Sequence, residues 1–179
     1  MPYHLIFGGC VMHKFVLALT ALAVALPAQA APPKARALQD IYKAGFMDCA
    51  PAMEKFVEFL HEDDETYSYV GKFAVDKANQ SSASAITVVK YPDGQGVASI
   101  TGTKNAAGAC DVVLTHTLVV PGQTCDELRT TAFKDWKLFS QMNESNVYQD
   151  PTTPNGHAVL SPVGDKGCLM VKHLIGYGV

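Results

Sequence analysis

Residues 110–133 read CDVVLTHTLVVPGQTCDELRTTAF, and this stretch decides the fold. Its first half, residues 111–120, is an apolar run rich in β-branched side chains, which is typical of a strand. Pro121-Gly122 then predicts a turn. Thr124 and Glu127 form a capping box, because each side chain can accept a hydrogen bond from a backbone N–H group that the first turn of a helix leaves unpaired. We therefore expect a long strand that leads directly into a helix.

The N-terminal region has the organisation of a secretory signal peptide over residues 12–30, MHKFVLALTALAVALPAQA. Lys14 precedes an apolar run that is too short to span a bilayer, and Ala28 and Ala30 supply an A-x-A cleavage site. We expect translation to begin at Met12, so that residues 1–11 are a mis-assigned upstream start. The mature chain is then periplasmic or secreted, is cleaved between Ala30 and Ala31, and has no membrane span.

The mature chain, residues 31–179, has the length and composition of a single domain, and we expect its first part, residues 31–45, to be a mobile lead. Its charge balance is weakly acidic. The arginines Arg36 and Arg129 are far apart and no basic run occurs, so the electrostatic footprint of a nucleic-acid-binding protein is missing. We expect no nucleic-acid partner.

Four cysteines follow the leader, namely Cys49, Cys110, Cys125 and Cys168. An even number of cysteines in an exported chain predicts two disulfides. A bridge from Cys110 to Cys125 is disfavoured, because the extended strand between them is roughly 30 Å long whereas bridged Cα atoms lie within about 7 Å. If the last strand runs antiparallel to the central one, Cys168 comes close to Cys125. We therefore favour the pairs Cys125–Cys168 and Cys49–Cys110.

The remaining elements are short and closely spaced. Residues 50–60 follow the spacing of an amphipathic helix, and the helix after the corner should cover about residues 125–135. Strands are expected at residues 66–75, 86–91, 97–103, 157–161 and 168–175, with one bent strand or two short ones over residues 137–141 and 146–148. Short turns between strands favour antiparallel pairing. The sequence predicts an α+β two-layer sandwich, a mainly antiparallel sheet with two helices on one face.

Two histidines lie on strand faces that are otherwise apolar. Alternation places His116 among the apolar residues of the central strand and His173 among those of the last strand. A buried imidazole needs a hydrogen-bond partner, a ligand or water, so both are either hydrogen-bonded structural residues or the lining of a small-molecule site. No H-x-x-x-H or C-x-x-C spacing adds further metal ligands, and we expect no metal site.

The sequence offers no convincing catalytic machinery. Cys125 opens a helix and could be an activated thiol, but a structural disulfide is the better interpretation in an oxidising compartment. G-x-S-x-G and S-x-x-K motifs are absent. We assign no catalytic residue and no cofactor, and expect an exported, non-catalytic binding protein, for example an inhibitor or immunity-type partner of a periplasmic or secreted enzyme. The alternatives are a carrier of a small apolar ligand in a pocket on the sheet, and an exported hydrolase.

Overall fold

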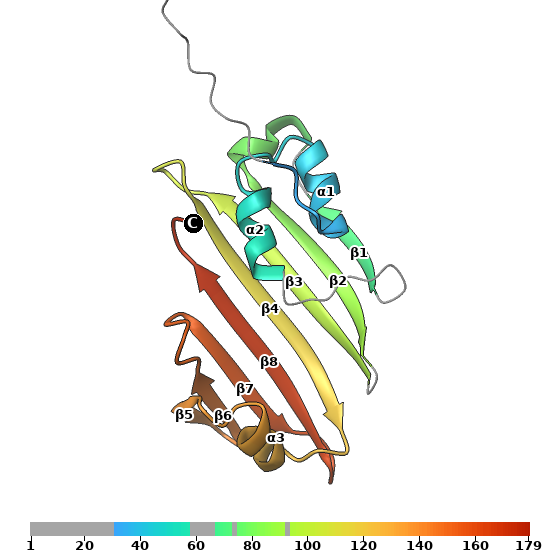
Figure 1. Cartoon of the computed structure of the whole chain (residues 1–179), viewed down its shortest axis with the longest axis vertical. Helices are drawn as coiled ribbons and strands as arrows, with labels where there is room; N and C mark the ends of the chain where they lie inside the picture. The colour runs from blue at the N-terminus through green and yellow to red at the C-terminus, as the bar shows by residue number, and fades with distance from the viewer. Residues whose placement is uncertain (1–30, 58–66, 73–74, 92–93) are drawn as a thin grey trace, which may run out of the picture.

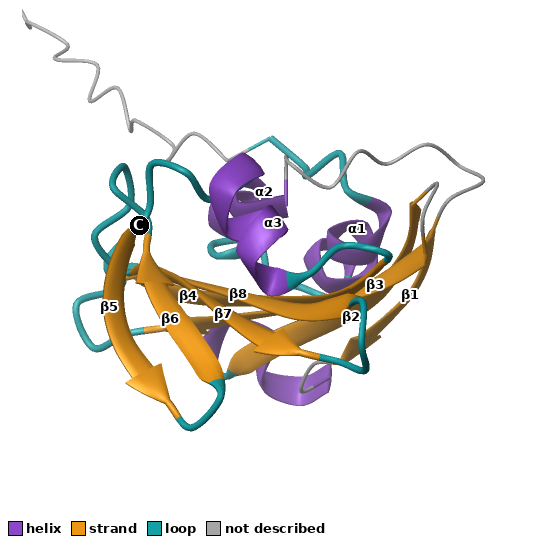
Figure 2. Cartoon of the chain, turned by 90° about the horizontal axis from the view of Figure 1, so that it is seen from below, coloured by secondary structure: helices purple, strands orange, loops and turns teal. Residues whose placement is uncertain are grey.

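The computed structural model describes residues 31–57, 67–72, 75–91 and 94–179, and they form one sheet with α-helices on one side (Figure 1 and Figure 2). Eight strands pair antiparallel in the order β1-β2-β3-β4-β8-β7-β6-β5. This arrangement confirms the predicted α+β class and antiparallel sheet. The predicted leader and upstream start lie outside the described residues. Among the described helices, none is long and apolar enough to cross a bilayer.

The strands fall into two groups, β1 to β4 and β5 to β8, which meet in the middle of the sheet where β4 pairs with β8. The strands are β1 (Tyr67–Lys72), β2 (Ser82–Tyr91), β3 (Gly94–Lys104), β4 (Cys110–Pro121), β5 (Lys137–Met142), β6 (Ser145–Gln149), β7 (Gly156–Pro162) and β8 (Gly167–Gly176). The helices are α1 (Arg36–Lys43), α2 (Ala50–Val57) and α3 (Cys125–Thr131), with a short 3-10 helix, η1 (Val75–Gln80). After β4, α3 leads the chain to the far edge of the sheet. Strands β5 to β8 then return, so that β8 pairs with β4.

The central strand β4 buries one of its two faces. Cys110, Val112, Leu114 and His116 are buried, whereas the side chains between them are partly exposed. The buried face looks toward the helices, because Val112 and Leu114 pack in the same core cluster as α1 and α2. The alternation predicted for this strand therefore places His116 on the helix side of the sheet.

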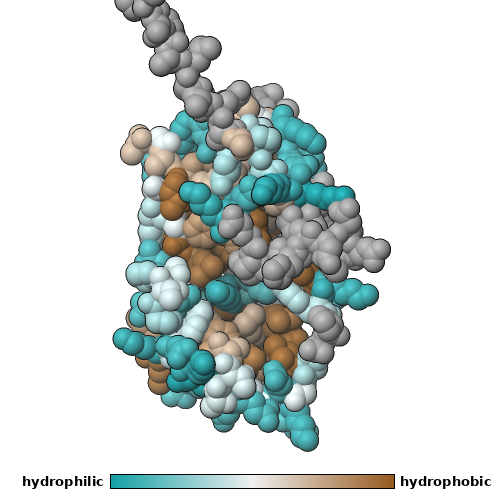
Figure 3. All heavy atoms as spheres, viewed as in Figure 1, coloured by the Kyte–Doolittle hydropathy of each residue, from teal (hydrophilic) through white to brown (hydrophobic). Residues whose placement is uncertain are grey.

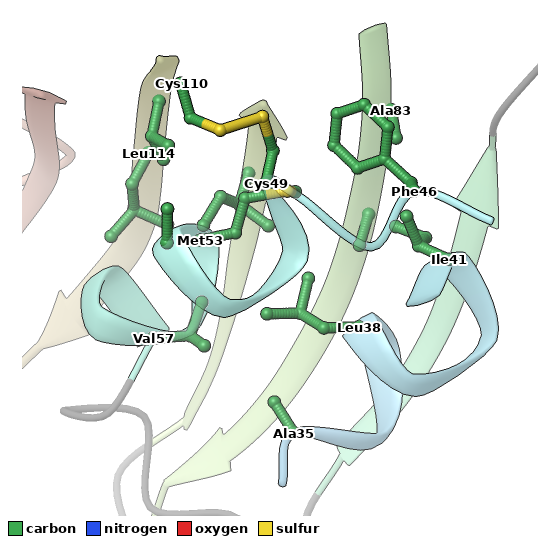
Figure 4. Packing of buried hydrophobic residues seen from close by; sticks show 14 of the residues in the cluster. Ala35, Leu38, Ile41, Phe46, Cys49, Met53, Val57, Ala83, Cys110 and Leu114 are labelled. Carbon is green, nitrogen blue, oxygen red and sulfur yellow. A yellow bond between two sulfur atoms is a disulfide. The ribbon is translucent and has the colours of Figure 1, made fainter. Parts of the chain in front are cut away.

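Helices α1 and α2 cover the end of the sheet where β4 begins. Leu38 and Ile41 of α1 and Met53 of α2 are fully buried and point at the sheet (Figure 4). Gly102 of β3 permits this close packing, since a Cβ atom there would lie 2.6 Å from Met53 Sδ. The mobile lead predicted over residues 31–45 needs correction, because α1 lies within it. Burial of Leu38 and Ile41 stabilises this segment by roughly 1.5–3 kcal/mol for each side chain.

Helix α3 covers the other end of the same face. Leu128 packs in a second core cluster with Phe133, Ala158 and Leu160. The predicted capping box is present, because Thr124 Oγ1 accepts from the Glu127 backbone N–H and the Glu127 carboxylate accepts from the Thr124 N–H. The helix is shorter than expected and ends at Thr131. Within the described residues, the predicted helices α2 and α3 lie on this face of the sheet and α1 joins them.

Two disulfides fasten the helices to opposite ends of the central strands. Cys49, just before α2, is bonded to Cys110 at the start of β4, and their Cα atoms are 5.5 Å apart. Cys125, at the start of α3, is bonded to Cys168 of β8, with Cα atoms 5.0 Å apart. Cys168 lies opposite Val120 near the end of β4, because β8 runs antiparallel to β4 as expected. The middle of the helix-side face lies between these two attachments.

Candidate functional site

A cleft of about 660 Å³ lies on the helix side of the sheet, beside α3. Its floor is formed by β4 and β8, and its walls by the end of β2, the segment that follows α3 and the loop between β6 and β7. Figure 3, viewed from the helix side, shows apolar atoms exposed between the two groups of helices. The lining residues used below are Tyr91, His116, Leu118, Phe133, Trp136, Asp150, Met170 and Lys172.

Two cross-strand pairs form the floor of the cleft. His116 of β4 lies directly opposite Lys172 of β8, and Leu118 lies opposite Met170. Residues two apart on a strand point to the same face and are roughly 7 Å apart. The floor therefore has a polar half next to an apolar half.

His116 is the most enclosed polar side chain of the cleft, with 5% of its surface exposed. Its Nε2 atom is 3.2 Å from the Tyr91 hydroxyl oxygen. Burial lowers the pKa of His116, and the positive charge of Lys172 lowers the pKa further. Because its ordinary value is 6.5, the imidazole is neutral at pH 7. Burial also raises the pKa of Tyr91, so its phenol keeps its proton.

The strand next to β4 leaves room for this imidazole. A Cβ atom on Gly96 of β3 would lie 2.8 Å from His116 Nε2 and 3.0 Å from a ring carbon of Tyr91. Any other residue would collide with both rings at once. The glycine therefore helps to define the position of the His116–Tyr91 pair.

An aromatic pair forms the wall beside α3. The Phe133 and Trp136 rings meet edge to face, with ring centroids 4.9 Å apart. The Arg129 guanidinium donates hydrogen bonds to the carbonyl oxygens of Phe133 and Lys134, which holds the segment after α3 in place. Lys172 Nζ lies 5.5 Å from the centre of the Trp136 ring, within the range of a cation–π interaction.

Asp150 is a carboxylate at the edge of the floor, and it accepts hydrogen bonds from its own loop. Only 9% of Asp150 is exposed, and its Oδ1 atom accepts hydrogen bonds from the Thr152 backbone N–H at 2.8 Å and the Thr152 hydroxyl at 2.7 Å. Burial raises the pKa of Asp150, but the Thr152 hydrogen bonds and the charge of Lys172 outweigh burial, so the pKa lies below its ordinary value. Asp150 is therefore ionised and shapes the loop.

The structure separates the two histidines that the sequence singled out. His173 lies opposite Thr115 on the other face of the sheet, and its Nδ1 atom is 3.0 Å from the Thr115 hydroxyl. His116 and His173 therefore cannot line one site, and the hydrogen-bonded interpretation describes His173. The residue of β8 that faces the cleft is its neighbour Lys172.

The disulfide at the start of α3 bears on the hydrolase alternative. Cys125 is in a disulfide, so the thiol nucleophile considered for a hydrolase is not available. Within the described parts of the chain, no group of three or more His, Cys, Asp or Glu side chains could hold a metal ion.

Sequence reasoning missed several lining residues, namely Tyr91, Trp136, Asp150 and Lys172. Each looks ordinary in the sequence. Strand register places Lys172 opposite His116, whereas the segment after α3 and the β6–β7 loop bring Trp136 and Asp150 to the same cleft. Comparison with protein-family models, with curated proteins and with solved structures found no match to this chain.

Proposed function

We propose that this protein is an exported, non-catalytic binding protein that holds a small amphipathic organic molecule in the cleft over His116. The observation that carries the proposal is the cleft itself, in which aromatic and aliphatic side chains lie beside polar and charged ones. The polar and charged lining residues are Tyr91, His116, Thr131, Lys134, Asp135, Asp150, Thr152 and Lys172. Small-molecule sites are typically concave, mostly apolar and roughly 300–1,000 Å³ in volume. The cleft of about 660 Å³ has both properties.

Export is supported by the disulfides and the leader. Two disulfides are consistent with an oxidising compartment outside the cytoplasm. Residues 12–30 supply the expected targeting signal. The full chain should be expressed and recovered from the exported fraction, where intact mass should correspond to a chain that begins at Ala31 and has no free thiol. An unprocessed, reduced protein in the cytosol would contradict export.

Ligand binding can be tested with a neutral apolar dye, N-phenyl-1-naphthylamine, whose fluorescence rises in an apolar site. Ala132 lines the cleft and is exposed, so Ala132→Phe should fill the opening without disturbing the core. We expect this variant to weaken dye binding at least about tenfold, or by about 1.4 kcal/mol. Ala106→Phe, at an equally exposed position in the turn between β3 and β4, is the control and should bind like the wild type. Equal binding by both variants would contradict the site.

A protein partner is the second candidate, and it is supported by the face of the sheet opposite the α-helices. Ile86, Val97 and Val119 are exposed there, although each is a large apolar residue. An inhibitor of an exported enzyme could use such a face. Val97→Lys should then abolish capture of that enzyme, whereas Ala107→Lys in the β3–β4 turn should not. If neither substitution changes capture, this face is not the contact.

A further inference from the structure

We infer that two copies of this chain associate through the face of the sheet opposite the α-helices, called the open face below, and form a two-fold symmetric dimer with one sheet packed on the other. The open face is distinct from the cleft, so the dimer does not depend on ligand binding. Three features support it, namely the apolar side chains of this face, their symmetry about the junction of β4 and β8, and the area of the face.

Strand β8 is apolar on both of its sides. Met170 and Leu174 pack on the helix side, whereas Leu169, Val171 and Ile175 alternate with them and lie on the open face. A strand of an antiparallel sheet with one solvated face normally alternates apolar with polar residues. The described α-helices lie on the other side of the sheet and do not cover these side chains (Figure 2). The composition of β8 is therefore that of a strand covered on both faces.

The strands beside β8 continue this apolar surface. Val171 lies opposite Val159 of β7 and opposite Thr117 of β4, and Thr117 in turn lies opposite Val97 of β3, so the four residues form one row across the sheet. Val97 is 44% exposed, and Val119, one step along β4, is 45% exposed. Soluble monomers rarely expose contiguous apolar patches larger than a few hundred Å². An apolar surface that crosses four strands therefore indicates a protein contact.

Ionic side chains are confined to the margin of the open face. On the four described central strands, β3, β4, β8 and β7, Asp111 is the only Asp, Glu, Lys or Arg residue on this side. It lies at the start of β4, where it accepts hydrogen bonds from the Asn105 side chain and the Gly178 N–H. A second copy can approach such a face without like-charge repulsion, whereas a charged partner surface would lose water without gaining an ion pair.

The apolar residues are symmetric about the line between β4 and β8, which favours a second copy over a different partner. A two-fold axis along this line, midway between two packed sheets, exchanges β4 with β8 and β3 with β7. Residues of one row then face residues of the same row in the other copy. The pairs that face each other are Val97 with Val159, Val119 with Leu169, and Val113 with Ile175. A two-fold contact requires a self-complementary patch of this kind.

One polar row crosses the open face, and it is hydrogen-bonded within each copy. Thr115, His173 and His157 are neighbours on this row. The Thr115 hydroxyl lies 3.0 Å from His173 Nδ1. Because this hydrogen bond is made inside one chain, a second sheet can cover Thr115 and His173 without breaking it.

The open face is large enough for a stable dimer. The four long strands β2, β3, β4 and β8 have 10 to 12 residues each, and the shorter β7 and β6 extend the face on one side. With roughly 4.8 Å between strands and 3.4 Å per residue, these six strands offer about 900 Å². Each partner of a standard interface buries roughly 800 Å². One face of the sheet therefore suffices without contacts from other parts of the chain.

Sedimentation equilibrium of the exported protein at pH 7, over a wide range of concentrations, tests the dimer. We expect the mass of two chains at the higher concentrations. Val97→Lys places two unpaired charges in the contact, one from each copy, and should raise the dissociation constant at least about hundredfold. Ala107→Lys adds the same charge at an exposed position in the β3–β4 turn and should change nothing. A dimer that Val97→Lys leaves intact would overturn the inference. A wild type that is monomeric at every concentration would also overturn it and would leave this face to the enzyme partner considered above.

Cross-linking tests the arrangement itself and does not rely on the lysine variant. A chain with both Val97→Cys and Val159→Cys should give a covalent dimer with a short bis-maleimide, because packed sheets are about 10 Å apart. Within one copy these positions lie three strands apart, or roughly 14 Å. The four cysteines of the mature chain are in disulfides, so the introduced thiols are the ones that react. Each single variant should give no covalent dimer, since Val97 faces Val159 and not its own copy. No covalent dimer from the double variant, or equal yields from the single variants, would contradict this two-fold arrangement.

Discussion

His116 and Lys172 lie directly across from each other on the two central strands, and both face the helices. In the folded protein, burial and the positive charge of Lys172 lower the pKa of His116, so its imidazole is easier to protonate after unfolding. The pair lies where β4 meets β8, at the junction of the two groups of strands. Protonation of His116 should therefore affect the stability of the fold as well as the cleft.

Stability should fall as the solution becomes acidic, in part because of His116. Its folded-state pKa lies below the ordinary 6.5, so the unfolded chain binds the proton more readily. Stability is therefore full above about pH 6.5 and falls as the pH decreases from there through the folded-state pKa. His116→Gln should show a smaller loss of unfolding free energy between pH 7 and pH 5 than the wild type. An NMR titration midpoint for His116 above 6.5 would contradict this account.

Gly96→Ala should destabilise the fold by about 1–3 kcal/mol, because the added methyl group would collide with His116 and Tyr91. Urea unfolding of the single variant and of the double variant with His116→Ala tests the cause. Truncating the imidazole should recover part of the loss, so the two effects should not add. Additive losses of unfolding free energy would show that a clash with the His116 ring is not what destabilises Gly96→Ala.

Removing either disulfide should lower the free energy of unfolding by about 2–4 kcal/mol. The bridges should differ in their effect on the cleft. Replacing both Cys125 and Cys168 by serine should also weaken dye binding, because that bridge anchors α3 and the aromatic wall that follows it. Replacing Cys49 and Cys110 by serine should leave dye binding of the folded protein unchanged, since neither residue lines the cleft. If both double variants weaken dye binding equally, the Cys125–Cys168 bridge has no special role in holding the wall of the cleft.

Asp150→Asn should cost about 1–3 kcal/mol at pH 7, because Thr152 would lose the charged acceptor that the buried Asp150 carboxylate provides. The folded-state pKa of Asp150 is lowered, so its stabilising effect is present above its ordinary value of 3.8 and is lost as the pH falls through the folded-state value. The difference in unfolding free energy between wild type and variant should therefore shrink in acid. A constant difference from pH 7 to pH 2 would contradict an ionised Asp150.

Much of the fold followed from local rules. The length of one strand disfavoured a Cys110–Cys125 bridge, and a last strand antiparallel to the central one would bring Cys168 near Cys125. The structure has this arrangement. The helix α1 was missed because residues 36–43 are few and follow Pro32-Pro33. Their apolar pair, Leu38 and Ile41, becomes informative only when a sheet is available to bury it.

The site was harder to predict because it depends on register. Alternation along a strand shows which residues share a face, but it does not show which face the helices cover. Alternation put His116 and His173 each on an otherwise apolar strand face. The structure places His116 on the helix-side face and His173 on the opposite face. The helix after the corner was expected to run to about residue 135, yet α3 ends at Thr131. Trp136 lines the cleft from the turn that follows, where its backbone N–H donates to the Phe133 carbonyl oxygen.

The most direct test of the account is an NMR titration of the exported, isotope-labelled protein with N-phenyl-1-naphthylamine at pH 7. Trp136 is the chain's single tryptophan, so its indole N–H signal reports on the aromatic wall without ambiguity. We expect large, saturable shifts of that signal and of the His116 ring, while Val97 on the opposite face stays unchanged. Shifts confined to Val97 and its neighbours, with Trp136 and His116 unmoved, would contradict a ligand site in the cleft.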